Sequence, residues 1–112
     1  MGLLENKVAV ITGAGAGLGR AYAKLLAQQG AAVVVNDYAA EAAERVVREI
    51  VELGGKGAAV AADVGSMESG RRILDAALAA YGQVDILVNN AGILRDRSLP
   101  KMERPSSSGA QT

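Results

Sequence analysis

The chain has 112 residues, of which 50% are hydrophobic, and its 12 basic and 12 acidic residues balance to a formal net charge of zero. This length allows one small domain, and the balanced charge argues against recruitment of nucleic acid or of an anionic membrane surface. Since the sequence contains neither Cys nor His, it has no disulfide framework, and it lacks the usual ligands of zinc and the usual general base of a catalytic site.

The first half of the chain alternates between strand-like and helix-like patterns. Residues 7–12 form a short apolar run that is typical of a buried strand. From Leu18 the apolar positions recur with the period of a helix, and Gly30 follows as a stop signal. Three consecutive valines within residues 32–36 favour an extended backbone, because β-branched side chains are stiff at χ1. A second helical pattern covers residues 43–53.

The second half continues the alternation. Residues 58–62 predict a weaker third strand, and Ser66 is placed to cap a third helix that ends at Gly82. Residues 84–88 predict a fourth strand. This βαβαβαβ order predicts a Rossmann-type α/β fold: a parallel sheet with strand order 3-2-1-4 and right-handed crossovers. Two helices would cover one face and one helix the other, an incomplete doubly wound domain, and the fourth strand would leave an apolar open edge through which the chain could associate.

A glycine-rich turn joins the first predicted strand to the first predicted helix, and it reads Thr12-Gly13-Ala14-Gly15-Ala16-Gly17-Leu18-Gly19. The amide groups and the dipole of a helix N-terminus favour a phosphate there, and glycine lets a pyrophosphate approach the backbone. The strand-turn-helix context is that of a dinucleotide-binding fingerprint. No Lys-Ser or Lys-Thr follows, which disfavours a nucleoside triphosphate loop. The alternative is a tight turn that only permits close packing.

Asp37 ends the second predicted strand, 18 residues after Gly19. A carboxylate at this place accepts hydrogen bonds from the adenosine ribose hydroxyls and repels a 2′-phosphate. Residues 14–16 and Tyr38 offer no basic side chain, so we expect NAD to be preferred over NADP. The alternative role for Asp37 is to cap the following helix, and both roles can coexist.

Two further polar groups follow the third and fourth predicted strands, at the edge where ligands of such sheets bind. Asp63 is placed to accept a hydrogen bond from the adenine amino group, or to form the turn that enters the next helix. The segment Asn89-Asn90-Ala91-Gly92 leaves room for a ligand beside small residues. Its asparagines alternatively stitch neighbouring strand ends together through their amide groups.

These patterns together resemble the short-chain dehydrogenase/reductase family over about residues 3–99. The matching signatures are Thr12-Gly13-x-x-x-Gly17-x-Gly19, Asp63-Val64 and Asn89-Asn90-Ala91-Gly92. Residues 13–37 and 92–98 resemble the branch that contains the (3R)-hydroxyacyl-CoA dehydrogenase unit of multifunctional enzyme type 2 and its bacterial relatives. Taken with the glycine turn, the resemblance assigns contacts with NAD to Gly13, Gly15, Ala16, Gly17, Leu18, Gly19, Asp37, Asp63, Val64, Asn90, Ala91 and Gly92.

The resemblance implies that a full-length relative transfers hydride between NAD and a hydroxyl or ketone substrate of the 3-hydroxyacyl-CoA type. Members of the family are longer and carry a catalytic Ser and a Tyr-x-x-x-Lys pair. Here each Tyr is followed four residues later by Leu26, Ala42 or Asp85. We therefore assign no catalytic residue, and we expect a truncated dehydrogenase that is inactive alone.

We expect residues 1–98 to form the NAD-binding half-domain and residues 99–112 to be a disordered tail foreign to the family, since this end is polar and contains two prolines. Two alternatives remain open: a non-enzymatic nucleotide-binding or interaction module, and a chain that does not fold stably. No signal peptide or membrane span is apparent, so we expect a cytoplasmic protein, or a peroxisomal one in a eukaryote.

Overall fold

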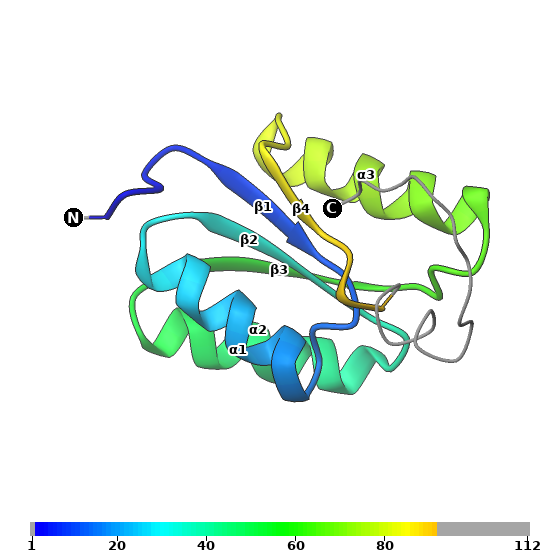
Figure 1. Ribbon diagram of the computed structural model, residues 1–112, viewed down its shortest axis with the longest axis horizontal. Coiled ribbons are helices and arrows are strands. Elements are labelled where there is room, and N and C mark those ends of the chain that lie inside the picture. Colours follow the sequence, from blue (N-terminus) through cyan, green and yellow to red (C-terminus); the bar gives the residue numbers. More distant parts are fainter. Residues whose placement is uncertain (1, 92–112) are drawn as a thin grey trace, which may run out of the picture.

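The computed structural model describes residues 2–91, which form a three-layer α/β arrangement (Figure 1). Strands and helices alternate along the chain in the order β1 (Val8–Ile11), α1 (Gly17–Gln28), β2 (Ala32–Asp37), α2 (Ala40–Glu52), β3 (Lys56–Ala61), α3 (Met67–Tyr81) and β4 (Ile86–Val88). The predicted tail over residues 99–112 lies outside the described residues. Within residues 2–91, no helix combines the length and the hydrophobicity that a membrane span requires.

The four strands form one parallel sheet in the order β3-β2-β1-β4, which confirms the predicted topology. The chain runs outward from β1 through β2 to β3, and then returns across the sheet to β4. With right-handed crossovers, this reversal places the first two helices on one face and the third on the other. Figure 1 shows that arrangement, with α1 and α2 on one side of the sheet and α3 on the opposite side.

Alternate residues of the strands point to opposite faces of the sheet and form two separate cores. The core under α1 and α2 contains ten buried residues, namely Ala9, Ile11, Ala14, Ala23, Ala31, Val33, Val35, Ala43, Val46 and Ile50. The core under α3 is smaller and contains Val10, Val34, Ala62, Ile73 and Ala77. Small aliphatic side chains dominate both cores, so the helices pack closely on the sheet.

The ends of the elements follow local chemistry. The Ser66 hydroxyl accepts a hydrogen bond from the Ser69 N–H at 3.1 Å, which confirms the predicted cap of α3. Gly82 closes α3 in the left-handed conformation with φ 79°. The fourth strand is shorter than predicted and begins at Ile86, because the Asp85 carboxylate accepts the Val8 N–H at 2.8 Å in place of a backbone carbonyl.

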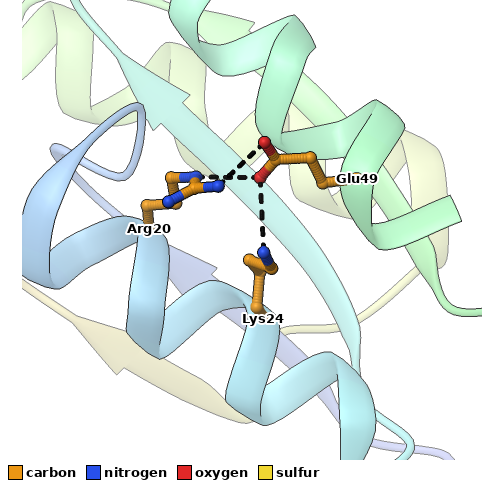
Figure 2. A network of polar contacts seen from close by, with 3 residues as sticks. All are labelled: Arg20, Lys24 and Glu49. Carbon is orange, nitrogen blue, oxygen red and sulfur yellow. Dashed lines mark hydrogen bonds and ion pairs between the residues drawn. The ribbon is translucent and has the colours of Figure 1, made fainter. Parts of the chain in front are cut away.

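A polar network links α1 to α2 across the surface of the molecule (Figure 2). The Arg20 guanidinium donates two hydrogen bonds to the Glu49 carboxylate, at 2.8 and 2.9 Å. The Lys24 ammonium lies 3.6 Å from the same carboxylate. The hydrogen bond from Arg20 lowers the pKa of Glu49, and the same bond raises the pKa of Arg20. The sequence-based reading did not predict this link, since its partners are 29 residues apart.

Candidate cofactor-binding site

The carboxyl ends of the strands meet around a pocket of about 100 Å³. Its lining comes from the glycine turn, from the ends of β2 and β3 and from the segment after β4, namely Gly13, Asn36, Asp37, Tyr38, Ala62, Asp63, Val64 and Ala91. Five of the predicted site residues thus share one pocket although they are spread over nearly 80 positions of sequence. The predicted Gly92 lies outside the described residues.

The glycine turn is held in place through the backbone of Gly13. This residue adopts φ +62°, a left-handed conformation that glycine tolerates. Its N–H donates to the Asn36 Oδ1 at 3.4 Å, and its carbonyl accepts from the Asn90 Nδ2 at 3.0 Å. The next amide, that of Ala14, donates to the Asn36 carbonyl at 2.7 Å. The ends of β2 and β4 therefore both hydrogen-bond to the turn, from opposite sides.

The remaining glycines of the turn have different surroundings. A Cβ on Gly19 would overlap the carbonyl oxygen of Gly13, and a Cβ on Gly15 would lie 2.6 Å from the Asp37 Oδ2. Close packing therefore requires glycine at these two positions, as the packing alternative proposed. Gly17 is different, because it adopts φ +59° and a Cβ there would meet no heavy atom within 4 Å.

Open space at Gly17 coincides with the start of α1. The N-cap residue Ala16 supplies no side-chain hydrogen bond to the first turn, and that turn contains no acidic residue. Leu18, also within this turn, is 60% exposed. The first amides of α1 are thus available to an anion from outside the protein. Packing and phosphate binding are compatible functions of different glycines in the same turn.

Asp37 lies at the wall of the pocket with a fixed carboxylate. Its Oδ2 accepts from the Gly15 N–H at 2.8 Å, and its Oδ1 accepts from the Ala39 N–H at 3.0 Å. The alternative in which Asp37 caps α2 is wrong, since Ala39 is the N-cap residue of that helix. The carboxylate instead forms a short turn before the helix and holds the glycine turn at the same time.

Asp63 and Val64 form the opposite wall, after β3. The Asp63 Oδ1 accepts from the Gly65 N–H at 3.1 Å, so the predicted role in the turn that leads to α3 is confirmed. Both side chains line the pocket, and Val64 also packs against the core under α3. Asp63 is therefore held by its own turn at the edge where a ligand would enter.

The segment after β4 stitches strand ends together, as the structural alternative proposed. Asn90 is only 2% exposed, and its amide donates to the glycine turn. The Thr12 hydroxyl donates to the Asn89 Oδ1 at 3.1 Å and accepts from the Ala91 N–H at 3.1 Å. These bonds bring Ala91 to the floor of the pocket, where its small side chain lies next to Gly13.

Asn36 is the site residue that sequence reasoning missed. It is only 1% exposed and lines the pocket between the glycine turn and β3. Its one available signal was a polar side chain in a strand otherwise made of valine and alanine. The strand pattern accounts for its position without indicating a function, and the acidic residue that follows it matches the expected fingerprint.

Among the described residues, none that lines this pocket belongs to a Tyr-x-x-x-Lys pair. Tyr38 lines it but is 82% exposed and precedes α2. Tyr81 lies at the opposite edge of the sheet, in a separate pocket of about 280 Å³ with Lys7 and Lys56, and burial raises its pKa. Over residues 2–91 no three potential metal ligands gather.

The model of the short chain dehydrogenase family matches residues 7–107 of this sequence. The chain belongs to the short-chain dehydrogenase family. It represents an N-terminal part of the family's domain, since the solved structures extend well beyond the region it matches.

Similar proteins include several dehydrogenases. The peroxisomal multifunctional enzyme type 2 of Drosophila melanogaster is 52% identical over 87% of this chain and 17% of its own length. The 7alpha-hydroxysteroid dehydrogenase of Escherichia coli is 49% identical over 80% of this chain and 35% of its own length. A structure of a 7 alpha-hydroxysteroid dehydrogenase complexed with NADH and 7-oxo glycochenodeoxycholic acid has a TM-score of 0.75 at 48% identity. This match covers 77% of the present chain and 34% of the solved one.

Proposed function

We propose that this chain is an NAD(H)-binding unit of a short-chain dehydrogenase, with the adenosine part in the pocket beside Asp37 and the pyrophosphate at the start of α1. The observation that carries the proposal is the open space at Gly17, at a helix N-terminus without a side-chain cap, in the same turn whose Gly15 N–H fixes the Asp37 carboxylate. Glycine at this position leaves space for a phosphate, whereas a side chain would occupy that space. The NADH complex of the hydroxysteroid dehydrogenase supports the assignment.

The preference for NAD over NADP is a part of this proposal and rests on Asp37. Two N–H groups orient its carboxylate, so its negative charge stays at the wall where a 2′-phosphate would have to fit. The cations of α1 do not compensate for this charge, because Arg20 and Lys24 are both paired with Glu49. A dinucleotide without the 2′-phosphate therefore binds better.

The bound cofactor would supply or accept the hydride, and the substrate would be a hydroxyl or ketone of the 3-hydroxyacyl-CoA type. This substrate class rests on the resemblance to the multifunctional enzyme type 2 branch, and the fly and mouse enzymes of that name are 52% and 44% identical to the chain over the matched residues. The printed sequence contains no Tyr-x-x-x-Lys, so we propose that it binds the cofactor and does not complete the reaction alone. The compartment we propose is the cytoplasm, or the peroxisome named for those relatives.

A second candidate is an interaction module, and the side of β4 that faces α3 supports it. Leu87 is 62% exposed on this side and lines a mostly apolar groove of about 260 Å³ together with residues of β1, α3 and the segments between the elements. Exposed apolar edges favour association. If this is the function, Leu87→Lys reduces association measured by sedimentation while NADH binding is unchanged.

Titration of the purified chain with NADH and with NADPH, followed by nicotinamide fluorescence, tests the cofactor proposal. We expect saturable binding that is tighter for NADH. The variant Asp37→Ala should narrow the difference between the two dinucleotides, whereas Asp75→Ala on α3 is a matched control that leaves it unchanged. A folded chain that binds neither dinucleotide would contradict the proposal, and equal affinity of the wild type for both would overturn the role of Asp37.

A further inference from the structure

Asn36 connects the two walls of the pocket through one buried side chain. Its Oδ1 accepts from the Gly13 N–H at 3.4 Å on the side of the glycine turn. On the other side its Nδ2 donates to the carbonyls of Val60 and Ala62, at 3.1 and 3.0 Å. These partners belong to segments that are 23 to 26 residues away from it in sequence. A single amide therefore spans the distance between the turn and the end of β3.

The amide of Asn36 can make these bonds in one orientation only. A carboxamide has two N–H donors on nitrogen and an acceptor oxygen, and here two carbonyls face the nitrogen while an N–H faces the oxygen. A flipped amide would place its oxygen against two carbonyl oxygens. Both donors are engaged within the protein, so neither N–H of this side chain is available to a ligand.

The position of Asn36 separates its action from that of Asp37. Successive residues of a strand point to opposite faces, so Asp37 reaches Gly15 and the side of α2, while Asn36 reaches β3 and the side of α3. The backbone carbonyl of Asn36 also accepts the Ala14 N–H at 2.7 Å. The glycine turn therefore rests on this residue through its main chain and its side chain together.

We propose that Asn36 is a positioning residue for the dinucleotide: its amide sets the spacing between the glycine turn and the segment after β3, and thereby the width of the adenosine pocket. The inference rests on the proposed cofactor function. A valine, the residue type that precedes it three times, would remove the side-chain link between the turn and β3 and leave only backbone hydrogen bonds to β2.

The decisive variant is Asn36→Asp, compared with the matched control Asn6→Asp at the opposite edge of the sheet. A protonated carboxyl keeps the shape of the amide, with one O–H donor for a carbonyl and one oxygen for the Gly13 N–H. An ionised carboxylate loses the donor and faces two carbonyl oxygens, which raises its pKa. We therefore expect the Kd for NADH to rise about tenfold or more at about pH 8 and to return toward the wild-type value near pH 5.5.

Two further carboxylates, those of Asp37 and Asp63, line the same pocket, so the wild-type profile over the same pH range is the reference. Circular dichroism and the unfolding midpoint are recorded at each pH. Loss of NADH binding with an unchanged fold, reversed on acidification, supports the proposal. Binding equal to wild type at both pH values overturns it, and so does a binding loss that only follows unfolding.

The variant Asn36→Ala provides a second test, since it removes all three bonds and adds no charge. A folded Asn36→Ala chain should also bind NADH about tenfold more weakly, at every pH. If the wild type and Asn6→Asp themselves do not bind NADH, the cofactor proposal fails, and this outcome is distinct from failure of the positioning role.

Discussion

The strands β2 and β4 are both rich in branched apolar residues, but their surroundings are very different. The three valines Val33–Val35 of β2 are completely buried, whereas Leu87 in the centre of β4 is 62% exposed. The difference follows from sheet order, since β2 lies between β1 and β3 while β4 has β1 as its one neighbour among the described strands. Strand hydrophobicity therefore does not measure burial; the position that the crossovers assign to a strand decides it.

The two strand ends nevertheless act on the same residue. Asn36, after the buried valines, binds the N–H of Gly13, and Asn90, after the edge strand, binds its carbonyl. The glycine turn is thus held from the well-packed side and from the exposed side of the sheet. Variants on each side can measure how much each neighbouring strand contributes to the stability of the turn.

The largest loss of stability should come from Gly19→Ala, which disrupts the close contact of α1 with the glycine turn and Asn90. The added Cβ would overlap the Gly13 carbonyl oxygen and lie 2.7 Å from the Asn90 Nδ2. Relieving this overlap requires the backbone to shift, so we expect a loss of about 3 kcal/mol in the free energy of unfolding. Chemical denaturation followed by circular dichroism measures it.

Gly70→Ala is the matched control, since Gly70 also lies within a helix but faces open space. There alanine should stabilise the fold by about 0.5–1 kcal/mol through its better helix propensity. Equal effects of the two substitutions would mean that the turn does not press against α1.

The next effect compares truncation in the buried strand with truncation in the edge strand. Val34→Ala removes a side chain with no exposed surface and should cost about 2 kcal/mol. Leu87→Ala removes a larger side chain but, because most of it is exposed, should change stability by less than about 0.5 kcal/mol. Urea unfolding midpoints provide the measurement. A cost at Leu87 as large as that at Val34 would show that a second chain or a further segment covers β4 in solution.

Sequence reasoning predicted the sheet order because the alternation of elements and the handedness of crossovers leave few topologies. It placed Asp37 and Asp63 at the correct edge for the same reason, since Asp37 ends the second strand and Asp63 follows the third. It could not separate Gly17 from Gly19, because one glycine faces open space and the other a carbonyl only in three dimensions. Asn36 was missed since a strand pattern marks which residues are buried, whereas its partners lie in two segments that only the folded chain brings together.

The smallest expected effect on stability concerns Asp85, at the amino-terminal end of the edge strand β4, and it depends on pH. The Asp85 carboxylate accepts the N–H of Val8 and a hydrogen bond from the Gln83 amide, and these bonds lower its pKa in the folded chain. A carboxyl whose pKa is depressed by folding stabilises the folded state above its unfolded pKa, and this contribution disappears as the pH falls through the folded pKa. The wild type should therefore lose stability below about pH 4.

Asp85→Asn should abolish that part of the acid dependence, because an amide still accepts the Val8 N–H but carries no titrating proton. Thermal midpoints of both proteins between about pH 7 and pH 3 provide the measurement, with the difference expected at neutral pH and shrinking toward pH 3. Asp75→Asn on α3 is the control for removal of one exposed carboxylate. If the wild type and Asp85→Asn keep a constant difference in thermal midpoint over this range, the ionised form of Asp85 does not contribute to the stability of the folded chain.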